Sequence, residues 1–375
     1  MSLDTTTLDP HKKNDLCTNQ LFSQVDCIDL FCGLGGLTHG LIKGGIRVIA
    51  GIDIDPQCRF PYETNNNAVF IEQNVRDLSS CELANMFGDR KLRLLAGCAP
   101  CQPFSNYSRR GRQKRDDMKW SLVSDFGRLV QEIQPEFITM ENVPQLVDHK
   151  VFEAFLTILK NYSTSWSIVD CALYGVPQTR KRLVLLASRL GSIELVSPEA
   201  FGQSLMTVRE AICHLPALKA GFSDPDDVLH SASSLSDINL RRIKASKPGG
   251  TWRDWDESLI AACHRKGSGQ TYPSVYGRMK WDSPAPTITT QCFGFGNGRF
   301  GHPDQDRAIS LREAALLQTF PDDYYFLAPG ERVSFSKFGR LIGNAVPVRI
   351  GEVVAKSVLE HIQKTYALQT KPSIS

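Results

Sequence analysis

The chain has 375 residues, of which 42% are hydrophobic and 22% are charged. These fractions are those of an ordinary soluble globular protein, long enough for a sizeable core and more than one domain. The formal net charge is only +3, so any nucleic-acid surface must be local rather than spread over the whole chain. No apolar run approaches membrane-spanning length, and no membrane partner is expected.

The cysteines point to a reducing compartment. Eleven cysteines occur at irregular spacing, and the first 20 residues are polar and charged, unlike a signal peptide. We therefore expect free thiols and a cytoplasmic protein. The close pair is Cys98 and Cys101. A zinc site would need a second such pair or nearby histidines, so no metal is expected.

The first strong pattern is "VDCIDLFCGLGGLTHGLIKGG", which begins at residue 25. It predicts a strand, a tight turn at Gly33, Gly35 and Gly36, and then a helix. A second predicted strand, "IRVIAGIDID", ends at Asp53 and Asp55, about 20 residues further on, which is a nucleotide-binding βαβ layout. The third glycine of the dinucleotide fingerprint is missing, which favours a nucleoside ligand over NAD. An ordinary tight turn is the alternative.

Strands and helices continue to alternate along the next hundred residues. The patterns predict strands over 92–97, 136–143 and 181–188 and helices over 121–134 and 151–162. Such alternation indicates a doubly wound, mostly parallel α/β sheet, whose ligands bind at the carboxyl ends of the strands. The residues expected at those ends are Asp29, Asp53, Cys101 and Glu141.

The composition changes after about residue 190: Ser, Gly, Pro, Asp and Arg become frequent, and the regular spacing of apolar residues is lost. The pattern over 351–366, near the C-terminus, predicts a clear amphipathic helix like those expected in the first domain. The expected divisions are a flexible leader over 1–22, a catalytic and cofactor-binding domain over 23–190, a small target-recognition domain over 191–315, a hinge over 316–342, and a return to the catalytic domain over 343–375.

Six motifs occur in order along the chain: "DLFCGLGG", "GCAPCQPFS", "ENV", "QTRKR", "SLREAALLQTFPD" and "GNAVP". Together they closely resemble the cytosine-5 DNA methyltransferase family, of the compact bacterial restriction-modification type. The resemblance covers residues 25–190 and about 275–360. It implies a Rossmann-like S-adenosylmethionine-dependent methyltransferase fold with a small irregular target-recognition domain. The implied reaction methylates carbon 5 of a cytosine within a specific duplex DNA sequence.

The resemblance assigns four catalytic residues. Cys101 is the nucleophile that adds to carbon 6 of cytosine, and its neighbouring prolines restrict where the thiol points. Glu141 protonates N3, Arg180 holds O2, and Arg182 holds Glu141 or nearby backbone in place. Taken singly, the residues allow plainer interpretations: a buried small cysteine, a helix-cap Glu-Asn, and a solvated basic turn at 180–182.

The resemblance also implies an S-adenosylmethionine pocket. Its residues are Phe31, Gly33, Gly36, Asp53, Ile54, Asn74, Pro100, Leu122, Asn344 and Val346. Asp53 stands where family members commonly carry Glu, Ile54 replaces an aromatic residue, and Asn74 replaces Asp. Asn74 can still accept a hydrogen bond through its side-chain oxygen. A turn residue is the alternative role for Asn344.

A base inside a duplex cannot reach Cys101, so the implied reaction requires base flipping. The basic loop after Cys101 is expected to close over DNA, with Gly111 as its hinge; a solvated charged loop is the alternative. The expected DNA contacts there are Gln102, Ser105, Arg109, Arg110 and Arg112. Further candidates for contact in the small domain are Arg241, Arg242, Trp252, Arg253 and Trp255.

Three rival functions remain to be compared. A tRNA cytosine-5 methyltransferase predicts a Cys-Phe-Thr signature, whereas Cys292 and Phe293 are followed by Gly294. A catalytically dead binding module usually lacks the cysteine or the glutamate, and the glycine spacing disfavours an NAD-dependent oxidoreductase. The expected partner is double-stranded DNA. We also expect a monomer near the bacterial nucleoid, with a cognate restriction endonuclease, if one exists, acting as a separate protein.

Overall fold

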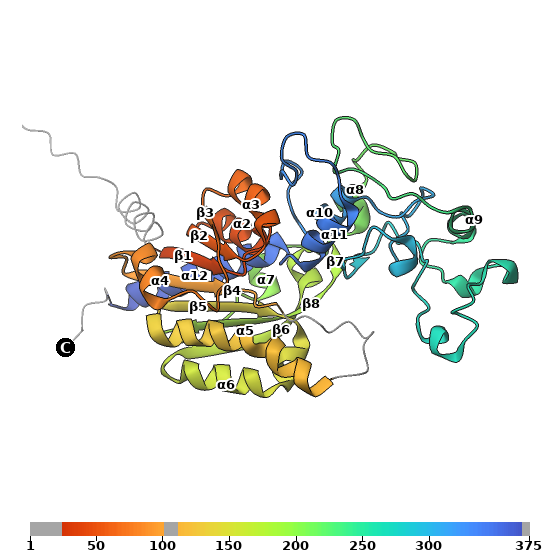
Figure 1. Ribbon diagram of the computed structural model, residues 1–375. Coiled ribbons are helices and arrows are strands. Elements are labelled where there is room, and N and C mark those ends of the chain that lie inside the picture. Colours follow the sequence, from red (N-terminus) through yellow and green to blue (C-terminus); the bar gives the residue numbers. More distant parts are fainter. Residues whose placement is uncertain (1–24, 101–111, 370–375) are drawn as a thin grey trace, which may run out of the picture.

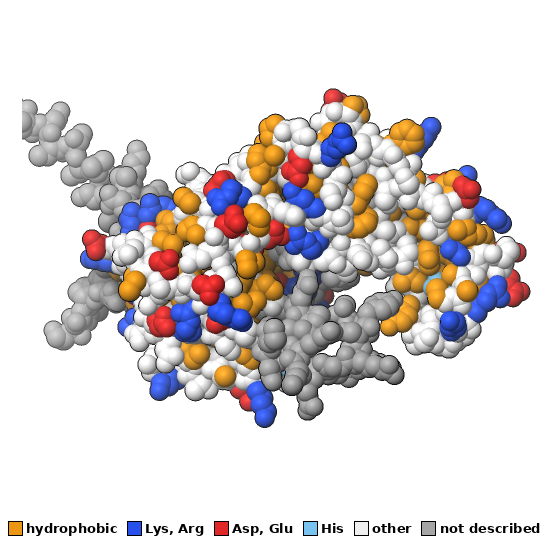
Figure 2. All heavy atoms as spheres, viewed as in Figure 1, with side chains coloured by type: hydrophobic (Ala, Val, Ile, Leu, Met, Phe, Trp, Pro, Cys, Tyr) orange, Lys and Arg blue, Asp and Glu red, His pale blue; other side chains and the backbone are white. Residues whose placement is uncertain are grey.

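The computed structural model describes the backbone of residues 25–100 and 112–369, and the side chains of all of these except 112–120 and 368–369. A central sheet with helices on both faces forms the larger part, and the residues that follow it form a smaller, mostly irregular part beside the sheet (Figure 1). On the face seen in Figure 2, basic and acidic side chains are interspersed over the larger part, in keeping with the low net charge.

Seven strands form the sheet, in the order β3-β2-β1-β4-β5-β8-β6. Their bounds are β1 (Val25–Leu30), β2 (Arg47–Asp53), β3 (Val69–Glu72), β4 (Leu92–Gly97), β5 (Phe137–Asn142), β6 (Ser163–Asp170) and β8 (Lys181–Ser188). The first five run parallel, whereas β8 pairs antiparallel with both β5 and β6. The central strands β1 and β5 are buried along their whole length, as their continuous apolar runs predict. The expected doubly wound, mostly parallel α/β fold is confirmed.

Helices cover both faces of the sheet. The helix bounds are α2 (Gly36–Lys43), α3 (Arg59–Asn65), α4 (Ser80–Phe87), α5 (Arg112–Ile133), α6 (Lys150–Ile158), α7 (Pro198–Phe201), α8 (Val208–Ile212), α9 (Asp237–Ala245), α10 (Leu311–Leu317), α11 (Phe335–Asn344) and α12 (Val348–Gln369). One apolar core joins α4, α5 and α6 to the sheet, and another joins α2 and α12 to the opposite face. The C-terminal helix therefore returns to the larger part.

The smaller part contains short helices and a two-stranded parallel sheet of β7 (Gln178–Thr179) and β9 (Ala285–Pro286). Trp252 and Trp255 are each only 6% exposed, because they form a small apolar core with Leu259. Little of either side chain is therefore exposed for the contact with DNA for which both are candidates. Arg241 and Arg253 are exposed, while Arg242 is half-buried against an aromatic ring of that core.

The expected domain divisions stay predictions, and two features of the fold bear on them. The last strand of the large sheet ends at Ser188, but one apolar core joins residues of the glycine turn, such as Leu34, to α10 and α11. The leader over 1–22 lies outside the described residues. Within the described part, no helix is long and apolar enough to cross a membrane.

Candidate active site

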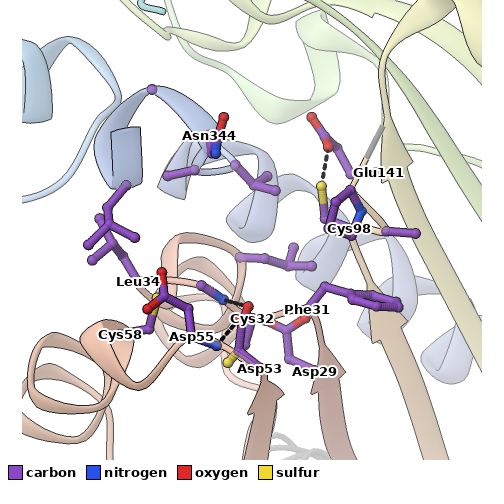
Figure 3. A pocket seen from close by; sticks show the side chains of 18 of the residues that line it. Asp29, Phe31, Cys32, Leu34, Asp53, Asp55, Cys58, Cys98, Glu141 and Asn344 are labelled. Atoms are coloured by element: carbon purple, nitrogen blue, oxygen red, sulfur yellow. Dashed lines mark hydrogen bonds between the residues drawn. The ribbon is translucent and has the colours of Figure 1, made fainter. Parts of the chain in front are cut away.

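A cavity of about 530 Å³ opens where β1, β2, β4 and β5 end, and the end of α11 closes its opposite side (Figure 3). Its lining residues are Asp29, Phe31, Cys32, Gly33, Leu34, Leu37, Asp53, Ile54, Asp55, Cys58, Cys98, Ala99, Pro100, Glu141, Asn142, Val143, Arg180, Arg182, Arg340, Leu341, Gly343, Asn344, Ala345 and Val346. The volume lies within the range of roughly 300–1,000 Å³ that is typical of small-molecule sites.

One end of the cavity is organised around Asp53. The backbone N–H of Gly33 donates to its Oδ2 and the N–H of Asp55 donates to its Oδ1, both at 2.9 Å. Figure 3 shows both bonds converging on the carboxylate. Burial raises the pKa of Asp53 above its ordinary value, although the two amides oppose the rise. The carboxylate is thus fixed in direction and keeps lone pairs for hydroxyl groups of a ligand.

The backbone around this carboxylate is shaped for a ligand. Phe31 has a φ of +59°, a left-handed conformation that is strained for an aromatic residue and is often found at functional sites. Ile54 lines the same cavity and is 65% exposed. A carboxylate for ribose hydroxyls beside an exposed apolar side chain for a purine ring fits S-adenosylmethionine, which has a nucleoside and no pyrophosphate.

Asp29 lies beneath this end of the cavity. Its Oδ2 accepts a hydrogen bond from Oγ1 of Thr38 at 2.7 Å, whereas its buried Oδ1 has no hydrogen-bond partner among the described residues. Burial raises the pKa of Asp29 to about 7, and the bond from Thr38 opposes part of the rise. This carboxyl therefore changes its charge close to neutral pH.

The other end of the cavity is organised around Glu141, at the carboxyl end of β5. Gly97 of β4 pairs with Met140 of β5, so the next residue of the β4 chain, Cys98, lies beside Glu141. The Cys98 thiol donates to Oε2 of Glu141 across 2.9 Å, as Figure 3 shows. On the opposite side, Nε of Arg182 lies 2.8 Å from Oε1, an ion pair without the alignment of a hydrogen bond.

Arg180 is buried beside this carboxylate but is bonded elsewhere. Its Nη1 donates to the carbonyl of Ile288 at 3.0 Å, and its Nη2 donates to the carbonyls of Gly343 and Ala345 at 3.4 Å. Its buried Nε has no partner among the described atoms. Burial, reinforced by the positive charge of Arg182, lowers the pKa of Arg180 to about 10. Arg180 therefore ties the strand region to the end of α11 and to the smaller part.

The cavity unites most of the expected site residues that the structure describes. Those that line it are Phe31, Gly33, Asp53, Ile54, Pro100, Glu141, Arg180, Arg182, Asn344 and Val346. Gly36, Asn74 and Leu122 are not among the described lining residues. A Cβ on Gly36 would lie 2.3 Å from the carbonyl oxygen of Val346, so packing explains this glycine. The side-chain oxygen of Asn74 accepts from the backbone N–H of Arg76 at 3.1 Å.

Several expected residues cannot be placed. Cys101, Gln102, Ser105, Arg109 and Arg110 lie outside the described residues. Arg112 begins α5, but its side chain is not described. Leu122 on the same helix is half-buried and packs in the apolar core beneath the sheet.

The structure adds lining residues that sequence analysis missed. Asn142 donates through Nδ2 to the carbonyl of Ala99 at 3.0 Å and so braces the chain that leads to Cys101. Arg340 of α11 places Nη2 2.7 Å from Oδ2 of Asp55 at the cofactor end. The strand register could have suggested Cys98, but no local pattern points to Arg340. No group of three or more His, Cys, Asp or Glu side chains suited to a metal occurs in the described part.

Solved structures share this fold. A putative DNA modification methyltransferase from an E. coli prophage superposes with a TM-score of 0.70 at 22% identity, covering 90% of this chain and 99% of that one. The Dnmt2 methyltransferase of S. pombe gives 0.61 at 18% identity, covering 90% and 99%. These likenesses show that the chain has the same overall fold as these two proteins, built on the same kind of mixed seven-stranded sheet.

The sequence comparisons give the family. Residues 25–360 match the model of C-5 cytosine-specific DNA methylases, and the chain belongs to that family. The Type II methylase M.HgiDII of Herpetosiphon aurantiacus is 51% identical over 347 residues, covering 91% of this chain and 97% of the relative. The Type II methyltransferase M1.HphI of Haemophilus parahaemolyticus is 32% identical, covering 89% and 86%. The protein is a DNA (cytosine-5-)-methyltransferase, an enzyme class that uses S-adenosylmethionine.

Proposed function

We propose that this protein methylates carbon 5 of one cytosine in a specific duplex DNA sequence through a covalent adduct between Cys101 and carbon 6. The observation that supports the site best is the single cavity that joins Asp53 to Glu141. A cofactor held at the Asp53 end would present its methyl group to a base held at the Glu141 end. The remaining residue roles follow from that arrangement.

The chemistry begins at carbon 6. A Cys101 thiolate forms a bond to carbon 6 while N3 takes a proton from the Glu141 carboxyl, which converts the ring to an enamine. Bound S-adenosylmethionine supplies the methyl group that carbon 5 then accepts. A base removes the proton from carbon 5, the bond between sulfur and carbon 6 breaks, and N3 returns its proton to Glu141, which releases methylated cytosine and free Cys101.

The contacts favour different roles for Arg180 and Arg182. Arg182 lies against Glu141 and is only partly buried, so it can hold the acid and also meet O2 of the base. Both terminal nitrogens of Arg180 already donate to main-chain carbonyls. We therefore assign Arg180 mainly to holding the two parts of the protein together around the cavity, and Arg182 to the base.

Double-stranded DNA is the substrate, and the target cytosine leaves the stack to reach the cavity. Gln102 and Ser105 would contact the DNA beside the flipped base, and Arg109, Arg110 and Arg112 would pair with phosphates. The tRNA alternative has less support, because the family model and its bacterial relatives are named for DNA methylation or as Type II enzymes. Those Type II names support a protective role in restriction-modification, with any cognate nuclease a separate protein. A monomer in the bacterial cytoplasm, near the nucleoid, suits that role.

A fluorine trap tests the covalent step. Duplex DNA with 5-fluorocytosine at the target should hold the enzyme in a complex that survives boiling in detergent, because fluorine cannot leave as the carbon-5 proton does. The complex should require S-adenosylmethionine and should not form with Cys101→Ser. As a matched control, Cys213→Ser changes an exposed cysteine on the smaller part and should trap like wild type. Absence of a shifted band at a site the enzyme demonstrably methylates would reject the Cys101 mechanism.

Glu141→Gln tests the acid. The amide cannot deliver the N3 proton, so tritiated methyl transfer to DNA should fall by about 10²-fold or more while the fold is kept. A thermal melt far below wild type would show a structural role instead.

A further inference from the structure

We propose that Cys98 is a positioning residue for Glu141 in methyl transfer, an inference that rests on the proposed role of Glu141 as the acid. The thiol lines the cavity but is not the nucleophile. It acts by holding the carboxyl group that meets N3.

The strand register places the thiol there. β4 and β5 pair in parallel with a constant offset, so Gly97 lies opposite Met140 and the following residues, Cys98 and Glu141, lie side by side at the strand ends. The same offset places Asn142 beside Ala99, whose carbonyl accepts a hydrogen bond from Asn142. The contact between Cys98 and Glu141 is thus a consequence of the sheet rather than of a free side chain that happens to approach.

The two oxygens of Glu141 have different partners. Arg182 faces Oε1, and Cys98 donates to Oε2 at 2.9 Å. Among the described residues, no other donor reaches Oε2. A single ion pair would leave the carboxyl plane free to turn about the side-chain axis. Two partners on opposite oxygens fix that plane, and a fixed acid needs less reorganisation when the base arrives.

The chemistry of the donor suits the task. A second cation at Oε2 would favour the ionised carboxylate and so oppose delivery of a proton. A thiol is a weak, neutral donor that orients the oxygen without adding positive charge. Because Glu141 is only 4% exposed, water has little access to replace that donor.

Two substitutions of Cys98 distinguish a role as hydrogen-bond donor from a role in packing. Cys98→Ala removes the donor and should lower kcat for methyl transfer about tenfold, the upper order expected for the loss of one buried hydrogen bond. Cys98→Ser keeps a donor and should retain at least about half of the wild-type kcat. KM for S-adenosylmethionine should change less than about twofold in both. A packing role predicts the reverse order, with Ala active and Ser impaired, and that result would overturn the proposal.

A double-mutant cycle tests whether Cys98 acts through Glu141. In Glu141→Gln protein, adding Cys98→Ala should lower the residual rate less than about twofold, because the group to be positioned has gone. A tenfold loss in that background as well would show that Cys98 acts on something else.

A third measurement needs no methyl transfer and separates this proposal from the proposed function. In Cys101→Ser protein, alkylation of Cys98 by iodoacetamide is followed by peptide mass spectrometry, with and without Glu141→Gln. The amide of Gln accepts the thiol proton less well than the carboxyl of Glu141, so alkylation of Cys98 should be several-fold faster in Glu141→Gln protein, while that of exposed Cys213 is unchanged. Equal rates at Cys98 would refute the contact, whatever the enzyme does to DNA.

Discussion

Arg340 of α11 and Asp55 after β2 form an ion pair with 2.7 Å between Nη2 and Oδ2, although 285 residues separate them in the chain. The same nitrogen lies 3.1 Å from Oε1 of Gln57. Both members of the pair line the cavity beside Asp53, so a residue near the C-terminus closes a site that begins at residue 29.

Removal of this pair should weaken cofactor binding. Arg340→Met keeps the apolar stem and loses the charge, and the Kd for S-adenosylmethionine should rise about two- to fivefold, since a partly exposed ion pair contributes up to about 1 kcal/mol. Isothermal titration calorimetry measures the change. Arg209→Met is the control, because it breaks a comparable pair with Asp282 on the smaller part. An unchanged Kd for Arg340→Met would mean that the pair does not shape the pocket.

Two glycines of the turn should respond differently to alanine. A Cβ on Gly36 would lie 2.3 Å from the backbone oxygen of Val346, so Gly36→Ala must push α2 away from the C-terminal segment and should cost about 3 kcal/mol of unfolding free energy or more. A Cβ on Gly33 meets nothing within 4 Å, and its φ of +51° makes Gly33→Ala cost only about 1 kcal/mol. Urea unfolding of both variants measures these losses of unfolding free energy. Equal losses for the two variants would contradict this account.

The buried carboxyl of Asp29 should make stability depend on pH. Its pKa in the folded protein is raised from 3.8 to about 7, so the folded state holds a proton that the unfolded state releases. The stabilisation linked to that proton is complete below about pH 4 and is lost as the pH rises toward about 7. Asp29→Asn cannot ionise, so its unfolding free energy relative to wild type should rise by on the order of a few kcal/mol between about pH 4 and about pH 8. Denaturant titrations without cofactor measure the difference, and a constant difference would be inconsistent with a raised pKa.

The basic segment after Cys101 should control the salt dependence of DNA binding. Replacing Arg109, Arg110 and Arg112 with Gln should weaken binding to all sequences alike and reduce the slope of log K against log salt by about 2 to 3. Fluorescence anisotropy at several salt concentrations measures the slope. Lys43, Lys356 and Lys364, on α2 and α12, provide a control triple with the same loss of charge. A changed site preference with an unchanged slope would mean that these arginines read bases.

Local sequence was sufficient for much of the sheet. Continuous apolar runs such as 92–97 predicted buried strands, because a strand covered on both faces needs apolar side chains at every position. It did not predict β6, whose residues are mostly polar or exposed, because an edge strand is covered less completely. Nor did it predict that Trp252 and Trp255 are buried, since a tryptophan in an irregular segment suits a small core as well as a DNA surface.

By itself, the sequence determined the family, the order of the chemical motifs and the position of Asp53 and Glu141 at strand ends. These features are local, because each motif is contiguous and a strand end is marked by the residues around it. Only the tertiary structure decided that Cys98 and Arg182 contact different oxygens of Glu141, that Arg180 bonds main-chain carbonyls, and that Arg340 meets Asp55. Such pairs depend on strand register and on how distant segments pack. A local sequence pattern does not indicate which distant residue will lie beside it in the fold.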